Sequence, residues 1–268
     1  MDAFLSDISS VFEWASNMQL SVALQKCSVL NIGRQSDMSD VNINGVSIPS
    51  VSSMRDLGVI ILCNLKFGQH YETISKRALV MVNLIFKVFV SRDRQFLINM
   101  YKSYVRPILE YCSEVWNPYQ VKDIDSIEHV QKVFTRRLPG LKNLNYSERI
   151  EILNLETLEK RRLLKDLVMV YKCIHGLVDL PFQDFFTLER SLGTRGHAFK
   201  LSVNRCHLDV RKFFFCNRIV NVWNRLPSHV VAAQSLHIFK NYLCAVDFSE
   251  IKNILLYLGF NNFLKWGC

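Results

Sequence analysis

The hydrophobic pattern of the chain changes its period near residue 65, and this change constrains the fold more than any other feature. Before it, short β-branched runs dominate; Val41 to Ile48 reads VNINGVSI around an Asn-Gly pair, which is typical of a β-hairpin. After Phe67, apolar residues recur every three or four positions, which is the spacing of amphipathic helices. The pattern therefore predicts a mainly α protein with a small α+β part at its start.

In the first 65 residues we expect one helix and a small antiparallel sheet. The helix is predicted over residues 2–18, and the strands over 27–32, the hairpin 41–48 and 57–62. The later helices are predicted over residues 71–85, 96–115, 124–138, a short stretch opened by Asn145 and Glu148, 155–175, 210–226, 235–246 and 250–266. Pro107 is expected to kink the second of these helices, and Trp116 and Trp223 are expected to anchor the core.

The same pattern divides the chain into four parts. Strand signals stop at residue 65, and helical signals weaken between residues 179 and 207, where Gly193 and Gly196 indicate a connecting loop. We therefore expect an α+β part over 1–65, a helical domain over 66–178, the loop region over 179–207 and a C-terminal helical extension over 208–268.

Composition limits the kind of partner and the compartment. The 268 residues carry a formal charge of +9, which favours a polyanion such as nucleic acid or an anionic membrane surface. No apolar run reaches the length of a membrane span, and the N-terminus lacks the features of a signal peptide. Eight scattered cysteines without paired spacing are typical of reduced thiols, so we expect an intracellular protein, nuclear or cytoplasmic, with no metal site.

Six segments in one order carry a resemblance to a known family. They are WASNMQLSVALQKCSVLNIGR from Trp14, MRDLGVIIL from Met54, YKSYVRPILEYCSEVWNP from Tyr101, IEHVQKVFTRRLPG from Ile127, YSERIEILNLETLEKRR from Tyr146 and RKFFFCNRIVNVWNRLPSHVV from Arg211. The series resembles the region after the catalytic palm in reverse transcriptases of non-LTR retrotransposons, the jockey-like class in particular. It covers roughly residues 5–247 and implies a palm remnant over 1–65 followed by a helical thumb.

The resemblance implies roles for two sites in the palm remnant. Lys26, in the segment ALQKC, matches the lysine thought to donate a proton to departing pyrophosphate; a solvated strand lysine is the alternative. Leu57, Gly58 and Val59 match the family's primer-grip strand; a packing glycine is the alternative. The family's Mg²⁺ is held by palm aspartates, which we expect to precede Met1. The chain itself is thus expected to hold no cofactor and to be inactive as a polymerase on its own.

The family's thumb holds a template–primer duplex of RNA and DNA, which implies phosphate contacts by basic residues. The helical candidates are Lys76, Arg77, Lys87, Arg92, Arg94, Lys102, Arg106, Lys132, Arg136 and Arg137. A second basic stretch, interleaved with Phe199 and Phe213 to Phe215, includes Arg190, Arg195, Lys200, Arg205, Arg211, Lys212, Arg218 and Arg225. Rings and cations together can bind single strands. The alternative is that Phe214, Ile219 and Trp223 face the core and the cations are solvated.

These observations leave three functions open. The first is a truncated fragment of a retrotransposon RNA-directed DNA polymerase that retains template–primer binding, with no membrane partner and with the missing polymerase half as a candidate partner. The second is a helical protein-interaction scaffold without a nucleic-acid role. The third is a translated pseudogene fragment.

Overall fold

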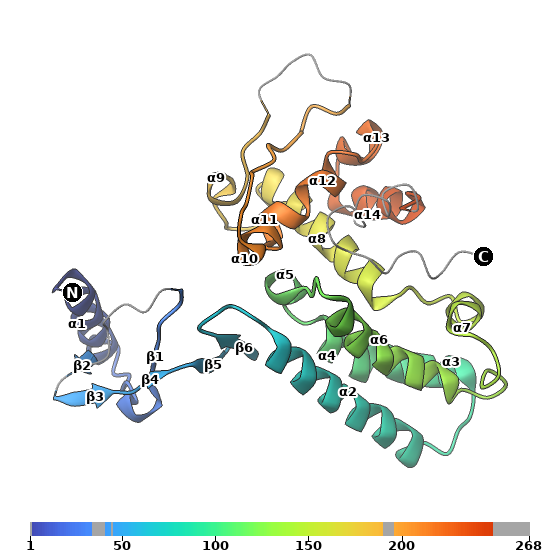
Figure 1. Cartoon of the computed structure of the whole chain (residues 1–268), viewed down its shortest axis with the longest axis horizontal. Helices are drawn as coiled ribbons and strands as arrows, with labels where there is room; N and C mark the ends of the chain where they lie inside the picture. The colour runs from blue at the N-terminus through green and yellow to red at the C-terminus, as the bar shows by residue number, and fades with distance from the viewer. Residues whose placement is uncertain (1, 34–40, 44, 190–195, 249–268) are drawn as a thin grey trace. The chain divides into compact units, whose positions relative to one another are not determined.

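The computed structural model describes residues 2–33, 41–43, 45–189 and 196–248, and the chain divides into two compact units between Lys66 and Phe67 (Figure 1). The predicted fold class is confirmed. Helices dominate the described chain, and its named strands all belong to the first unit.

In its described residues, the first unit holds one long helix and three two-stranded ladders. Its elements are α1 (Asp2–Asn17), a 3-10 helix (Leu24–Lys26), β1 (Val29–Leu30), β2 (Val41–Ile43), β3 (Val46–Ile48), β4 (Ser50–Val51), β5 (Ser53–Asp56) and β6 (Val59–Leu62). The predicted hairpin is present as β2–β3, and β5–β6 forms a second antiparallel hairpin. The prediction of one small antiparallel sheet is wrong, because the strands form separate pairs and β1 pairs with β4 in parallel. Pro49, which has no N–H to donate, separates β3 from β4.

The second unit begins with helices packed around one core. They are α2 (Gly68–Val88), α3 (Arg94–Met100), a π-helical turn (Tyr101–Val105), α4 (Arg106–Glu110), α5 (Ser113–Trp116), α6 (Val121–Arg136), α7 (Tyr146–Ile152) and α8 (Leu158–Ile174). Long helices α2 and α6 lie side by side (Figure 1). Tyr101 and Phe134 stack with ring centroids 4.4 Å apart, and Tyr71 donates a 2.7 Å hydrogen bond to the carbonyl of Trp116.

The helix predicted over residues 96–115 is interrupted twice. Pro107 has no N–H to donate to the carbonyl of Ser103, and the chain widens into the π-helical turn just before it. Cys112, with a φ of 54°, then separates α4 from α5. Trp116 is nonetheless buried, as expected of a core anchor.

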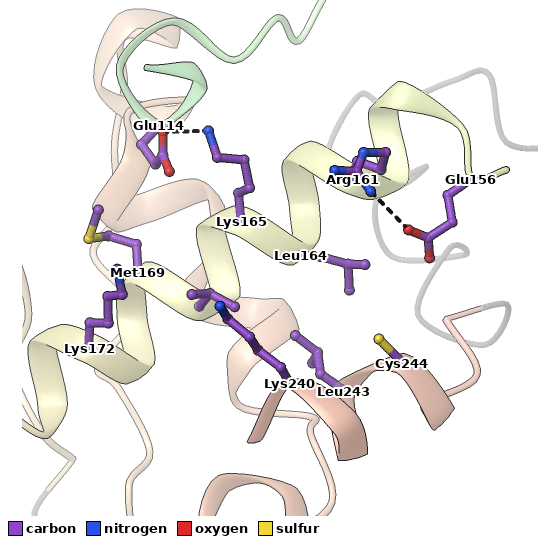
Figure 2. A pocket seen from close by; sticks show the side chains of 11 residues that line it. Glu114, Glu156, Arg161, Leu164, Lys165, Met169, Lys172, Lys240, Leu243 and Cys244 are labelled. Carbon is purple, nitrogen blue, oxygen red and sulfur yellow. Dashed lines mark hydrogen bonds and ion pairs between the residues drawn. The ribbon is translucent and has the colours of Figure 1, made fainter. Parts of the chain in front are cut away.

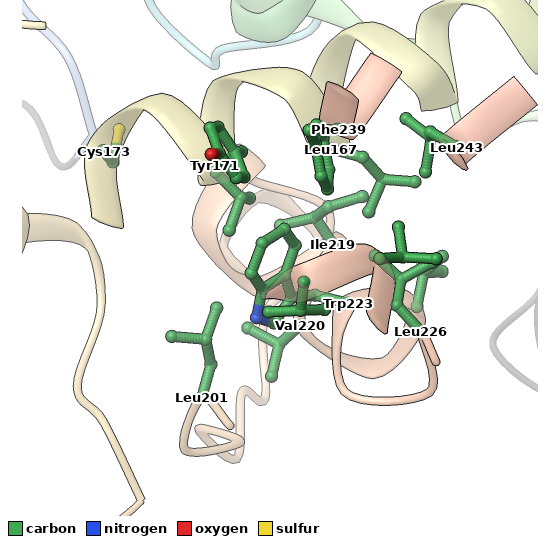
Figure 3. Packing of buried hydrophobic residues seen from close by; sticks show 14 of the residues in the cluster. Leu167, Tyr171, Cys173, Leu201, Ile219, Val220, Trp223, Leu226, Phe239 and Leu243 are labelled. Atoms are coloured by element: carbon green, nitrogen blue, oxygen red, sulfur yellow. The ribbon is translucent and has the colours of Figure 1, made fainter. Parts of the chain in front are cut away.

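A second core joins the C-terminal half of α8 to the segments that follow it, up to Phe248 (Figure 3). The helices around it are α9 (Phe182–Phe185), α10 (Asp209–Lys212), α11 (Phe215–Arg218), α12 (Val220–Trp223), α13 (Ser228–Val231) and α14 (Leu236–Ala245). Trp223 is fully buried and donates through Nε1 to the carbonyl of Phe199 at 2.8 Å. The helix predicted over 250–266 lies outside the described residues.

Two expectations for this part of the chain are corrected. The helix predicted over 210–226 is broken into α10, α11 and α12, and the extended backbone at Phe214 separates the first two of them. The segment 179–207, expected to be a loop, contributes the buried side chains of Phe186, His197 and Leu201 to the unit, and Leu188 forms a β-bridge with Leu201.

The helix ends follow the sequence signals. Asn145 caps α7 and forms the expected capping box with Glu148, and Gly176, with a φ of 61°, follows α8. No helix in the described part of the chain is long and apolar enough to cross a membrane.

Candidate nucleic-acid interface

Five cations gather where α2 and α6 end and α3 begins. Arg137 donates from Nη1 to Oδ1 of Asn83 at 2.6 Å, and its guanidinium carbon lies 4.2 Å from the ring centroid of Phe86, so α6 is held to the last turns of α2. Arg94 donates from Nε to the carbonyl of Pro139 at 2.8 Å, which brings the start of α3 to the same place. We call this surface the basic end; its members are Lys87, Arg92, Arg94, Arg136 and Arg137.

The basic end carries uncompensated positive charge. Across the described residues, none of its five cations has a carboxylate oxygen within 4.0 Å. Asp93 lies nearby, but its side chain caps α3 by accepting from the N–H of Phe96 at 2.7 Å. The C-terminal end of each helix dipole is equivalent to about half a negative charge, so α2 and α6 offset about one of the five positive charges.

A cationic hollow of about 400 Å³ adjoins the basic end at Arg136. We call it the α6–α7 hollow; it is lined by His129, Lys132, Val133, Arg136, Lys142, Leu144 and Arg149. The α6 members recur at intervals of three and four residues, which places them on one face of the helix. Sequence reasoning found Lys132 and Arg136 but missed His129, Lys142 and Arg149.

Arg149 forms the buried part of the hollow. Its guanidinium donates from Nη1 to the carbonyl of Leu144 at 2.7 Å and from Nε to Oγ1 of Thr135 at 3.2 Å. A third donor, Nη2, lies 3.4 Å from the carbonyl of Lys132. Burial lowers the pKa of Arg149 from its ordinary value, because the charged form loses hydration.

The remaining candidates of the helical thumb lie away from the basic end. Lys76 and Arg77 are exposed in the first half of α2, and Lys76 forms an ion pair with Glu72. Arg106 is half-buried with its Nε 3.9 Å from Glu110, and burial lowers its pKa. Lys102 is half-buried in the π-helical turn.

The C-terminal basic stretch is only partly exposed. The cationic groups of Arg211 and Lys212 lie 5.6 Å and 5.2 Å from the ring centroids of Phe214 and Phe213. Phe214 is 39% exposed rather than in the core, where Phe215 takes its place. Lys200 is half-buried, and Arg190 and Arg195 lie outside the described residues.

Arg218 does not belong to a solvated stripe. It is buried and binds Asp166 with two hydrogen bonds, from Nε to Oδ2 at 2.8 Å and from Nη2 to Oδ1 at 2.9 Å. A pair of this kind holds α11 against α8 and leaves no charge for a ligand.

The two sites predicted in the first unit have a different local structure from the one expected. Lys26 is exposed in a 3-10 helix rather than in a strand. Leu57 and Gly58, with φ values of 43° and 90°, form the turn between β5 and β6, and only Val59 lies in a strand. Leu57 is 83% exposed at this turn.

The described residues do not fit the Mg²⁺ site that the resemblance implies for the intact enzyme. No three His, Cys, Asp or Glu side chains in the described ranges come together in a metal-binding arrangement. The buried carboxylates serve the fold instead. Asp166 binds Arg218, and Glu128 accepts hydrogen bonds from the Tyr146 hydroxyl and the Leu158 N–H.

A second hollow, of about 400 Å³, lies between α8 and α14 (Figure 2). Its apolar lining includes Leu164, Met169 and Leu243. Two of its cations are offset by acids, because Lys165 lies 3.5 Å from Glu114 and Arg161 lies 3.6 Å from Glu156. This hollow is therefore a weaker site for a polyanion than the basic end.

Fold and site together define a mainly helical protein with a concentrated cationic surface on its larger unit. The sequence is 25% identical over 132 residues to the RNA-directed DNA polymerase from mobile element jockey of Drosophila melanogaster, a match that covers 48% of this chain and 14% of the polymerase. It is 26% identical over 143 residues to an uncharacterized protein of Caenorhabditis elegans, covering 52% of this chain and 71% of that protein. No family model and no solved structure matches.

The similarity indicates a reverse-transcriptase-like relationship. The matched region amounts to about one seventh of the length of the jockey polymerase.

Proposed function

We propose that the larger unit binds the phosphate backbone of an RNA/DNA template–primer duplex, as the thumb-like portion of a retrotransposon RNA-directed DNA polymerase. The observation that carries the proposal is the basic end, where five cations from the ends of α2 and α6, the start of α3 and the loop before it meet without a paired carboxylate in the described structure. Contacts of this type hold a duplex without reading its sequence.

The similarity to the jockey polymerase supports the choice of nucleic acid over other polyanions. The exposed turn at Leu57 and Gly58 is compatible with a primer-grip role for the β5–β6 hairpin. Because the described carboxylates do not fit a magnesium site, we further propose that this chain alone does not add nucleotides. Incorporation above background in a primer-extension assay with the purified chain would refute that part of the proposal.

Salt-dependent binding tests the main proposal. We expect the affinity for a fluorescent RNA/DNA duplex to fall steeply with salt, because each phosphate contact contributes about 0.9 to the slope of log K against log salt. The test variant is Lys87→Gln/Arg92→Gln/Arg136→Gln, in which the substituted side chains are exposed. The matched control is Lys76→Gln/Arg77→Gln/Lys122→Gln, which removes the same charge from exposed helical positions outside the basic end.

The slope should decrease by about 2 to 3 in the test variant and by less than 1 in the control. An equal decrease of the slope in the two variants would show that binding depends only on net charge and would refute the assignment of duplex binding to the basic end. Weak binding with no salt dependence would favour the interaction-scaffold function instead.

A further inference from the structure

All of the polar residues that line the α6–α7 hollow are basic. His129, Lys132 and Arg136 come from α6, Lys142 comes from the following loop, and Arg149 comes from α7. Lys132 is paired, with its Nζ 3.1 Å from Asp125. The other three fully charged residues, Arg136, Lys142 and Arg149, have no carboxylate oxygen within 4.0 Å in the described part of the chain.

Arg149 makes this arrangement unusual, because it is 6% exposed yet all three of its hydrogen-bond acceptors are uncharged oxygens. A buried cation is costly unless an anion compensates it. Three donors fix the guanidinium in place, and a guanidinium has five N–H groups, so two remain for a further acceptor. The fold thus supplies a fixed cation without supplying its counter-ion.

We infer that the α6–α7 hollow binds a phosphomonoester, and that its source is the terminal phosphate of a nucleic-acid strand. A monoester carries about 1.5 to 2 negative charges and three acceptor oxygens, whereas a backbone phosphate carries one charge. Three uncompensated cations therefore match the terminal group better than an internal one. The volume of about 400 Å³ can also hold the attached sugar, which Val133 and Leu144 can contact.

The assignment of the phosphomonoester to the end of a nucleic-acid strand rests on the proposed function. The inference that the hollow prefers a phosphomonoester to a backbone phosphate does not. The test compares two short RNA/DNA duplexes that differ only in a 5′-phosphate or a 5′-hydroxyl group, by fluorescence anisotropy. Adenosine 5′-monophosphate and inorganic phosphate serve as competitors. We expect the phosphorylated duplex to bind at least about tenfold more tightly, because charge-assisted hydrogen bonds are stronger than neutral ones.

The test variant is Arg136→Gln/Lys142→Gln, and the control is Lys122→Gln, on the first turn of α6 and outside the hollow. Arg149 is left unchanged because it holds the loop at Leu144. The preference for the 5′-phosphate should disappear in the test variant and persist in the control.

Each outcome separates the two proposals. Steep salt dependence with equal affinity for the two duplexes would overturn this inference and leave the proposed function standing. Binding of adenosine 5′-monophosphate without preference between the duplexes would place the phosphomonoester on a small molecule and overturn the strand-end source. Loss of the preference in Lys122→Gln as well would overturn the assignment to this hollow.

Discussion

The substitution Asp166→Asn should destabilise the larger unit more than any substitution on its surface. Asp166 and Arg218 are buried, and Asp166 Oδ2 also lies 3.2 Å from Nδ2 of Asn117. Arg218 further donates to the carbonyl of Glu114 at 2.8 Å. Asp166→Asn keeps the volume of the side chain but removes its charge, so the guanidinium is left buried without a counter-ion.

The size of the effect follows from this burial. Breaking a buried ion pair by removing one partner costs about 3–5 kcal/mol. In a unit of roughly 200 residues, 1 kcal/mol shifts the melting temperature by about 2–4 °C, so we expect a fall of about 6–20 °C. The exposed pair of Glu72 and Lys76 is the control, and Glu72→Gln should leave the free energy of unfolding nearly unchanged, because solvent screens the pair.

Urea unfolding followed by tryptophan fluorescence measures both variants. The double variant Asp166→Leu/Arg218→Met should recover part of the loss, because it removes the stranded charge, although the carbonyls of Glu114 and Phe213 lose their donor. A cost below about 1 kcal/mol for Asp166→Asn, with an unchanged m-value, would show that the pair is solvated and that the reasoning is wrong.

Three further predictions concern stability. Burial lowers the pKa of His197, so the neutral imidazole contributes fully to the free energy of unfolding above the ordinary pKa of about 6.5, and this contribution is lost as the pH falls through the lowered pKa. His197→Gln should therefore remove this loss of stability at acid pH, measured by urea titrations between about pH 7 and 5. Asn145→Ala removes the capping box and should cost about 1 kcal/mol by the same assay, whereas Ser147→Ala should cost less. Gly140→Ala should cost about 1–2 kcal/mol by thermal melting, because φ is 74° and an added Cβ would lie 2.5 Å from Nη2 of Arg94; an unchanged melting temperature would contradict this geometry.

The sequence predicted those parts of the fold that depend on local signals. The capping box at Asn145 and the helix end at Gly176 need only neighbouring residues, and both are present. Trp116 and Trp223 are buried as expected, because large aromatic side chains on the apolar faces of amphipathic helices pack inward. The fold class was also predictable, because the hydrophobic period changes from that of strands to that of helices near residue 65.

The errors arise where distant residues decide the outcome. Three consecutive phenylalanines have no periodicity of their own, and the chain buries Phe215 while Phe214 stays partly exposed. Arg218 looks like one more cation in a basic stretch, but its partner Asp166 is 52 positions away in sequence. Of the residues that line the α6–α7 hollow, Lys132 and Arg136 were candidates from the sequence because they lie on one helix, whereas Arg149 reaches the hollow only through the folding of the loop.

The π-helical turn at Tyr101–Val105 has a consequence for how this segment tolerates changes in length. Leu97, Tyr101, Val105 and Leu109 are all fully buried at intervals of four, although a regular α-helix rotates by about 100° per residue and would drift by about 40° at each such step. The wider turn absorbs this drift by holding one surplus residue. A homologue one residue shorter between positions 102 and 104 would therefore keep the same inward side chains at the spacing of a regular α-helix, with Pro107 still breaking one backbone hydrogen bond, whereas an equal deletion in α6 would turn its buried stripe away from α2.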